Sequence, residues 1–235
     1  MIKGVFFDLD GTLVPMDLDV FTKGYLEELC KVLCPYGIDD KTLVKSMLVG
    51  MRAMRVNDGK KTNKEVFWEK FTEVTGLEPD RFIEHSEPFY TKEFNNTRKY
   101  TEDNALAGLA VELAHKNGRK VVLATNPFFP VTAQITRANW VGVDGDRFDL
   151  ITSYENEVYC KPNPKYYLSI CERLDLLPEE CLMVGNDEND DIKPATEAGL
   201  NCFLVTDCLI PCDGYKSTCP SGSFEDLIEY LKNLT

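Results

Sequence analysis

Short apolar runs recur along the chain, and turn or polar residues bound each of them. The runs are rich in β-branched or aromatic side chains, which is typical of short buried strands. The predicted strands are Gly4–Phe7, Lys120–Ala124, Phe148–Thr152, Cys181–Val184 and Cys202–Val205. Nearly continuous apolar strands that alternate with helices predict an α/β fold, in which a parallel sheet is covered on both faces.

Apolar residues at helical spacing lie between most of these runs. One such stretch ends at Gly118, a residue type that favours the position just after a helix, and another covers Tyr166–Leu174. The last predicted helix begins after Ser223, and Asp226 follows three residues later in a capping-box pattern. These helices supply the alternation that the α/β interpretation requires.

The interval from Pro15 to Asn96 departs from this alternation because it contains no convincing strand. Amphipathic stretches fill it, and we predict helices at Asp19–Val32, Asp40–Met54, Asn63–Thr75 and Pro79–Asn95. About eighty helical residues directly after the first strand are too many for an ordinary crossover connection. We therefore predict an all-α subdomain over residues 15–96, inserted into an α/β core made of residues 1–14 and 97–235.

The composition indicates a globular protein with an acidic balance. The chain has 235 residues, of which 43% are hydrophobic and 28% charged, and its formal net charge is −13. Broad binding to nucleic acid or to anionic membranes is disfavoured, because it needs a basic surface. No apolar run reaches about 18 residues, so no membrane-spanning helix is predicted. The early carboxylate of Asp8 argues against a secretory signal, and we expect a cytoplasmic location.

Charge is distributed unevenly along the chain. Lys41–Lys70 holds eight basic and three acidic residues, a net charge of +5, so the rest of the chain carries −18. Two interpretations of this basic stretch stay open. It is either a solvated helix face or a surface that attracts an anionic substrate toward a site.

The nine cysteines are scattered, and no two of them form a CxxC pair. Without a predicted secretory signal, we expect reduced thiols. A loose C-terminal group consists of Cys202, Cys208, Cys212 and Cys219. Its irregular spacing does not match the paired ligands of a structural zinc site. Small apolar side chains and surface thiols are therefore the favoured interpretation over a zinc or redox centre.

Asp8 and Asp10 come directly after the first predicted strand. Residues two apart in an extended backbone face the same side, so both carboxylates can meet one ligand. Charge at the end of a buried strand needs compensation, and carboxylate oxygens suit Mg²⁺. Gly11 permits a sharp turn, and DLDGTL after an apolar run is far more specific than an isolated pair of aspartates.

Polar residues also follow the second predicted strand and precede a later helix. Thr125 and Asn126 end the run VVLA, where a hydroxyl can donate to a bound anion; the alternative for Thr125 is a helix cap. Lys161 precedes Pro162, which suits the first turn of a helix. This lysine either neutralises charge in a site or is an ordinary surface residue.

An acidic loop follows the fourth predicted strand. Gly185–Asp191 has the sequence GNDENDD, with four acidic residues in five positions before a helix predicted at Ile192–Ala198. Asp191 is the expected cap of this helix, because a helix N-terminus favours negative charge. One cap does not require so many carboxylates, so a divalent cation explains the loop better.

These motifs occur in the order acidic, hydroxyl, lysine, acidic, at the sheet edge where parallel α/β folds bind ligands. The chain resembles the haloacid dehalogenase (HAD) superfamily of hydrolases through Asp8–Thr12, Val121–Thr125, Lys161-Pro162 and Gly185–Asp191. The resemblance covers nearly the whole chain. It implies a Rossmann-like core with strand order 3-2-1-4-5 and a helical cap of the C1 type after the first motif.

The resemblance also implies a role for each motif. Asp8 is similar to the nucleophile that forms an aspartyl-phosphate, and Asp10 to the general acid and base. Thr125 and Lys161 would hold phosphoryl oxygens. Mg²⁺ would be bound by Asp8, by the backbone carbonyl of Asp10 and by the loop Gly185–Asp191.

One position departs from the family pattern. Members with this loop length usually carry an aspartate where this chain has Asn186, although Asp187 and Asp191 keep the family's shorter spacing. Either Asn186 supplies a neutral oxygen to the metal, or Asp187 turns inward and replaces it. Charge favours Asp187, because Mg²⁺ prefers a carboxylate to an amide.

Asp10 separates two chemistries, because the dehalogenases of the superfamily lack an aspartate there. The leading hypothesis is a Mg²⁺-dependent phosphatase that hydrolyses a small phosphorylated metabolite. The alternative is a phosphomutase of the β-phosphoglucomutase kind, and the intact motifs disfavour a binding protein without activity. The candidate substrate-binding residues are Asn126, Arg52 and Arg55, with Lys60 and Lys61 nearby.

Overall fold

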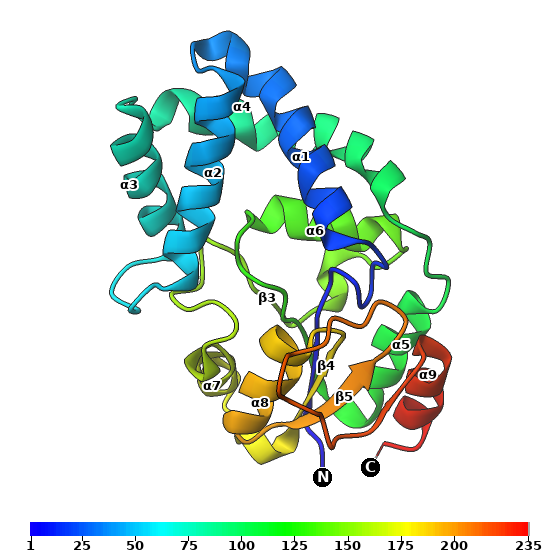
Figure 1. The fold of residues 1–235 in the computed structure, drawn as a ribbon. Helices are drawn as coiled ribbons and strands as arrows, with labels where there is room; N and C mark the ends of the chain where they lie inside the picture. The colour runs from blue at the N-terminus through cyan, green and yellow to red at the C-terminus, as the bar shows by residue number, and fades with distance from the viewer. Residues whose placement is uncertain (235) are drawn as a thin grey trace.

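The computed structural model describes residues 1–234, with a group of helices above an α/β core (Figure 1). Its strands form one sheet in the order β3-β2-β1-β4-β5-β6, and every neighbouring pair is parallel. They are β1 (Gly4–Phe7), β2 (Lys120–Leu123), β3 (Leu150–Ile151), β4 (Cys181–Gly185), β5 (Asn201–Val205) and β6 (Ser221–Gly222). The predicted α/β class and the order 3-2-1-4-5 of the first five strands are confirmed.

The sixth strand is the one that the sequence pattern did not indicate. β6 pairs with Leu204 and Val205 at the end of β5. A strand of two residues, serine and glycine, carries no apolar run from which it can be recognised. It extends the edge of the sheet without changing the order of the other strands.

Helices and shorter 3₁₀ or π-helical segments connect the strands. The α-helices are α1 (Leu18–Leu33), α2 (Asp40–Arg55), α3 (Asn63–Thr75), α4 (Asp80–Phe89), α5 (Ala107–Ala114), α6 (Val131–Trp140), α7 (Pro164–Arg173), α8 (Lys193–Glu197) and α9 (Phe224–Lys232). The 3₁₀ turns are η1 (Cys34–Tyr36), η2 (Glu93–Tyr100), η3 (Lys116–Gly118), η4 (Gly145–Arg147) and η5 (Pro178–Glu180), and η6 (Glu188–Ile192) is a π-helical turn. The predicted capping box of α9 is present, because Ser223 and Asp226 each accept the other's N–H.

The helix expected at Pro79–Asn95 is divided in two. α4 ends at Phe89, and the chain continues as η2 from Glu93. Pro88 lies in the last turn of α4, where it lacks an N–H for the helical ladder. The backbone then leaves helical geometry at Lys92, with φ −116° and ψ −90°.

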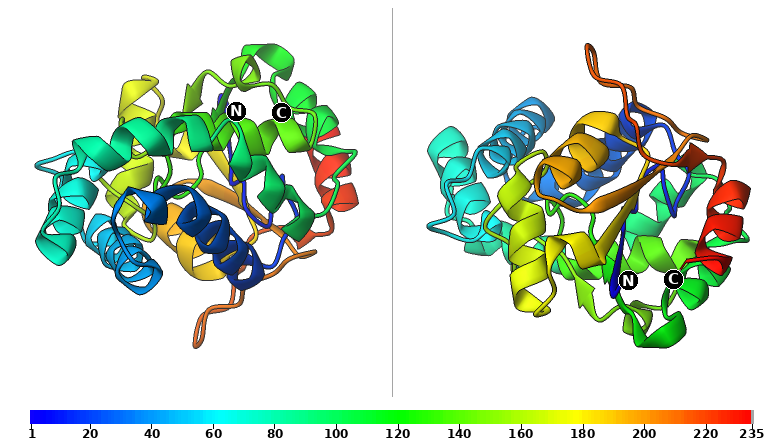
Figure 2. Two further views of the ribbon diagram at one scale, coloured as in Figure 1. Left: turned by 90° about the horizontal axis from the view of Figure 1, so that it is seen from above. Right: turned by 90° about the horizontal axis from the view of Figure 1, so that it is seen from below.

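Helices cover both faces of the sheet (Figure 2). On one face Phe6 of β1 belongs to an apolar cluster with Ile170 of α7. On the other face Val5 and Phe7 belong to a cluster with Leu227 of α9. Because alternate residues of β1 point to opposite faces, both clusters bury this central strand completely.

Helices α1–α4 follow β1, precede β2 and lie above the carboxyl ends of the strands (Figure 1). Backbone hydrogen bonds join the start of α3 to a core loop, from Lys64 N–H to the Tyr154 carbonyl at 2.7 Å and from Asn63 N–H to the Glu157 carbonyl at 2.9 Å. These helices are therefore attached to the core at a second place, away from the chain connections. Among the described helices, none has the length and apolar character to cross a membrane.

Candidate active site

A cavity of about 140 Å³ lies at the carboxyl ends of the strands. β1 leads into Asp8 and Asp10, and β2 leads into Thr125 and Asn126. Lys161 reaches the same place from the loop before α7. Because β2, β1 and β4 are neighbours in a parallel sheet, residues far apart in the sequence line one cavity. The loop after β4 adds Asn186, Asp187 and Asp191 to its lining.

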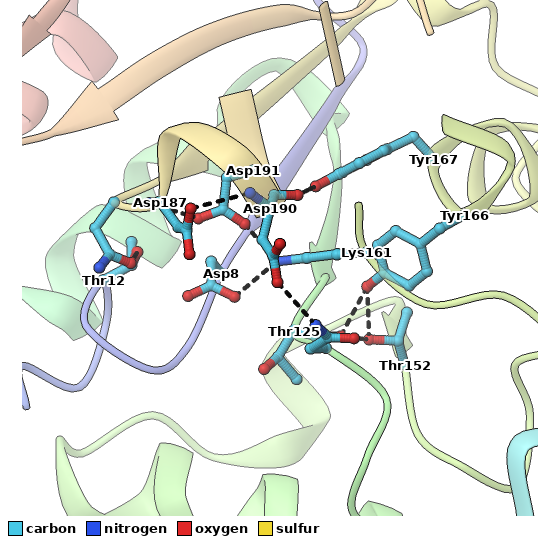
Figure 3. Close-up of polar contacts among 12 residues, drawn as sticks. Asp8, Thr12, Thr125, Thr152, Lys161, Tyr166, Tyr167, Asp187, Asp190 and Asp191 are labelled. Carbon is cyan, nitrogen blue, oxygen red and sulfur yellow. Dashed lines mark hydrogen bonds and ion pairs between the residues drawn. The ribbon is translucent and has the colours of Figure 1, made fainter. Parts of the chain in front are cut away.

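The side chain of Lys161 lies between two carboxylates at the floor of this cavity (Figure 3). Its ammonium donates to Asp8 Oδ1 at 2.7 Å and to Asp191 Oδ1 at 2.6 Å, and the residue is only 1% exposed. Burial alone lowers the pKa of Lys161, but the charges of Asp191 and Asp8 outweigh it and hold the pKa well above its ordinary value. Lys161 is thus a buried cation of the cavity and not a surface lysine.

Thr125 is held by hydrogen bonds to its backbone. Its carbonyl accepts from the Tyr166 hydroxyl at 2.8 Å and from Thr152 Oγ1 at 2.8 Å (Figure 3). The next helix along the chain, α6, begins after Pro130, so Thr125 is not its cap. Within residues 1–234 its hydroxyl makes no hydrogen bond, so a bound anion can use it.

Asp10 has a partner that the sequence analysis missed. Arg137 of α6 is fully buried and forms an ion pair with Asp10 Oδ2. Burial raises the pKa of the Asp10 carboxyl above its usual value, although the Arg137 charge opposes this shift. Arg137 shares a helix face with Ala133 and Trp140, which are both buried, and this helical spacing is the signal by which the arginine could have been noticed.

The acidic loop uses its carboxylates differently from the prediction. The expected helix cap at Asp191 is wrong: the N-cap of α8 is Ile192, which makes no side-chain cap hydrogen bond. Asp187 instead caps the turn η6, where its Oδ1 accepts from the N–H groups of Asn189 at 2.7 Å and Asp190 at 3.0 Å. The reason is that the chain forms the turn η6 before α8, which moves the first helical N–H groups toward Asp187. Asp191 instead contacts Lys161 and accepts from the Asp187 N–H at 3.1 Å.

Asn186 is buried beneath the loop that follows Asp10. Its Oδ1 accepts from the Thr12 hydroxyl at 2.9 Å, and its Nδ2 donates to the Cys208 carbonyl at 2.7 Å. Gly11, with φ +87°, makes this packing possible, because a Cβ there would lie 2.4 Å from Asn186 Nδ2. Both polar atoms of the Asn186 side chain are therefore used within the protein.

The donor atoms of the cavity fit a metal that needs few protein ligands. In residues 1–234 no three His, Cys, Asp or Glu side chains gather as a metal cage, and this includes the C-terminal cysteines. Mg²⁺ does not require such a cage, because it usually takes one or two carboxylates and keeps several waters. Asp8 Oδ2 and Asp187 Oδ2 accept no hydrogen bond from the described residues, so these two oxygens suit Mg²⁺.

The cationic candidates of the helical region do not all reach the cavity. Arg55 of α2 lines it, and its guanidinium pairs with Asp190 at 2.5 Å. Asp190 also accepts from Asn126 Nδ2 at 3.2 Å, so it connects α2 to the core. Arg52 lies instead in a separate cavity between α1 and α2. Lys60 and Lys61, outside the active-site cavity, pair with acidic residues of their own segment, Asp58 and Glu69.

The walls of the cavity are aromatic. Phe21 and Tyr25 of α1 face it from the helical region, and Phe128 and Phe129 from the loop after β2. The loop after β5 adds Ile210. The cavity therefore has a polar floor at the strand ends and an apolar wall, an arrangement typical of enzyme sites that exclude water from a charged reaction centre.

A cavity with paired aspartates, a buried lysine and a strand-end threonine defines a class of hydrolase, and comparison with known proteins agrees. The family model of haloacid dehalogenase-like hydrolases matches residues 2–199. The chain belongs to this family. Similar curated proteins are a phosphoglycolate phosphatase from Nitrosospira multiformis and the putative phosphatase YhcW from Bacillus subtilis. The first is 28% identical over 87% of this chain and 83% of its own length. The second is 27% identical over 87% and 84%.

Solved structures share the fold. A predicted phosphoglycolate phosphatase from Haemophilus somnus has a TM-score of 0.56 at 19% identity and covers 97% of each chain. A 2-haloacid dehalogenase from Pseudomonas syringae has a TM-score of 0.64 at 17% identity and covers 98% of this chain and 99% of its own. The family match and the curated relatives confirm the prediction of a phosphoric monoester hydrolase of the HAD type.

Proposed function

We propose that this protein is a Mg²⁺-dependent phosphatase that hydrolyses a small phosphorylated metabolite through an aspartyl-phosphate on Asp8. One observation carries the proposal. The Asp8 carboxylate lines the cavity, is paired with the buried ammonium of Lys161, and is followed two residues later by Asp10. Asp10 favours a phosphatase over a dehalogenase, because an alkoxide leaving group needs a proton and a halide does not.

In the proposed reaction, a carboxylate oxygen of Asp8 forms a bond to phosphorus while the bond from phosphorus to the leaving oxygen breaks. Asp10 gives its proton to that oxygen. It then takes a proton from the water that cleaves the aspartyl-phosphate. Lys161, the Thr125 hydroxyl and the Asn126 amide bind the phosphoryl oxygens and stabilise the charge that develops there.

Three groups of this chain would hold Mg²⁺: the carboxylates of Asp8 and Asp187 and the backbone carbonyl of Asp10. When bound there, the cation neutralises negative charge on the phosphoryl group. We choose Asp187 over Asn186 as the ligand from the acidic loop. Asp187 Oδ2 has no donor among the described residues, whereas both polar atoms of Asn186 are already used.

Residues 15–96 act in this proposal as a cap that selects the substrate, and residues 1–14 with 97–235 form the catalytic core. The lining of the cavity supports this division. α1 contributes Phe21 and Tyr25, and α2 contributes Arg55, opposite the aspartates of the core.

Phosphate release from a panel of sugar phosphates, nucleotides, phospho-acids and p-nitrophenyl phosphate tests this function. Phosphoglycolate belongs in the panel because a relative is named for it. We expect turnover of at least one small phosphomonoester with Mg²⁺ and its loss with a chelator. Turnover that depends on an added sugar bisphosphate would indicate the phosphomutase instead. No release from any compound would contradict both.

Arg55 and Arg52 offer a matched pair for testing substrate selection. Arg55 of α2 lines the active-site cavity, and it is the cation from α1–α4 among the described residues that does so. Arg52, three residues earlier in the same helix, lines a separate cavity. We expect Arg55→Ala to raise KM for the best substrate of the panel about tenfold, through loss of a charged hydrogen bond. KM for p-nitrophenyl phosphate should change less, and Arg52→Ala should leave both values unchanged. Equal effects of the two variants would remove Arg55 from substrate binding.

A further inference from the structure

Arg137 is an unusual residue for the interior of α6, because its guanidinium is fully buried. A buried charge needs a partner of opposite charge and further hydrogen bonds. Arg137 has both: Nη1 pairs with Asp10 Oδ2, Nη2 donates to Gln134 Oε1, and Nε donates to the Ala133 carbonyl at 3.4 Å. Its position is therefore fixed by three different groups.

Aromatic rings complete the surroundings of this guanidinium. Its central carbon lies 4.5 Å from the centre of the Phe129 ring and 5.9 Å from that of Phe21. Both rings also line the active-site cavity. They favour a cation on their faces and separate it from water. Arg137 thus lies behind the wall of the cavity and has no exposed surface for a substrate to touch.

The two oxygens of Asp10 are in different situations. Oδ2 is held by Arg137, whereas Oδ1 is buried and has no hydrogen-bond partner among the described residues. Asp10 itself lines the cavity. A buried carboxylate oxygen without a partner is costly, so an explanation in terms of function is warranted.

We propose that Arg137 is a positioning residue, which fixes the orientation in which the Asp10 carboxyl exchanges a proton with the substrate. This inference rests on the proposed phosphatase function. By holding Oδ2, the guanidinium prevents rotation of the carboxyl group. The proton then passes from the Asp10 carboxyl to the leaving oxygen as the bond from that oxygen to phosphorus breaks, and Arg137 neither gains nor loses a proton.

The dependence of rate on the leaving group tests this role. Phenyl phosphate and p-nitrophenyl phosphate share one ring, but only the poorer leaving group, phenol, depends strongly on proton donation. With Mg²⁺ present, we expect Arg137→Met to lower kcat for phenyl phosphate about 100-fold and for p-nitrophenyl phosphate less than about fivefold. KM for both should stay within about twofold. Arg137→Lys keeps the charge and should recover part of the loss.

Arg173→Met is the matched control. This variant breaks the ion pair between Arg173 and the buried carboxylate of Glu157, and neither residue lines the cavity. This variant should show no preference between the two leaving groups. If Arg137→Met does not fold, Gln134→Met takes its place, because it removes the acceptor of Arg137 Nη2 and leaves the ion pair with Asp10. We expect it to lower kcat for phenyl phosphate more than kcat for p-nitrophenyl phosphate, by a smaller factor than Arg137→Met.

The outcomes separate the two proposals. An equal loss of kcat for both esters in the Arg137 variants, or in Gln134→Met, would show that Arg137 is merely structural, and only this inference would fail. A wild-type protein that releases no phosphate from either ester or from the panel would overturn the phosphatase function and this inference with it.

Discussion

Asp8→Asn should abolish Mg²⁺-dependent phosphate release while leaving the fold intact. The substitution keeps the shape of the side chain but removes the nucleophilic oxygen, and loss of a nucleophile commonly lowers kcat by roughly 10⁴-fold or more. Lys161 keeps a charged partner in Asp191, so we expect little change in the folded structure. Steady-state kinetics, with circular dichroism on the same samples, measures both effects.

A covalent readout makes this prediction sharper. Acid quenching during turnover should trap a phosphorylated wild-type protein that intact mass spectrometry detects, and Asp8→Asn should show no such adduct. The control is Asp149→Asn, because Asp149 pairs with Lys120 outside the cavity. Wild-type rates in Asp8→Asn, or a trapped adduct in that variant, would sink the assignment of the nucleophile.

Lys161→Met is expected to have the largest effect on stability. It removes the cation between Asp8 and Asp191 and leaves two buried carboxylates without a counter-charge. Breaking a buried ion pair from one side typically costs about 3–5 kcal/mol of the free energy of unfolding. Phosphate release should fall as well, because the proposed phosphoryl-binding cation is gone. Urea denaturation followed by circular dichroism gives the free energy.

Lys120→Met provides the comparison for this variant. Lys120 pairs with Asp149 at 2.7 Å, but its side chain is 50% exposed. An exposed pair of this kind contributes about 0–1 kcal/mol. If the two lysine variants lost the same free energy of unfolding, the prediction that Lys161 stabilises the buried carboxylates would be contradicted.

The elements whose signals are local were predictable from the sequence. Apolar runs located the first five strands, and helical spacing placed α1, α2 and α3 within one residue at each end. At β1 an apolar strand, two aspartates and a turn glycine lie within a few residues of one another. This local motif was enough to predict that the site lies at the carboxyl ends of the strands.

What the sequence did not reveal depends on contacts between distant segments. Arg137 is separated from Asp10 by 127 residues, so nothing near it in the chain shows that its charge is compensated. Likewise, Asn186 Oδ1 accepts a hydrogen bond from Thr12, 174 residues away, and nothing near Asn186 in the chain shows that this oxygen has a donor. The different placement of Arg55 and Arg52 depends on the direction of each side chain on α2, which is set by how that helix packs against α3 and α1.

The placement of the helical region after β1 also has a consequence for how the molecule folds. β1 lies at the centre of the sheet, but Val5 pairs with Val121 of β2 and with Leu182 of β4. During synthesis on the ribosome, β1 therefore has no strand to pair with until more than half of the chain has been made. The intervening helices have mainly local contacts and can form in that time, whereas the sheet closes late because its central pairings span long loops. Asp8 thus acquires its surroundings only near the end of folding.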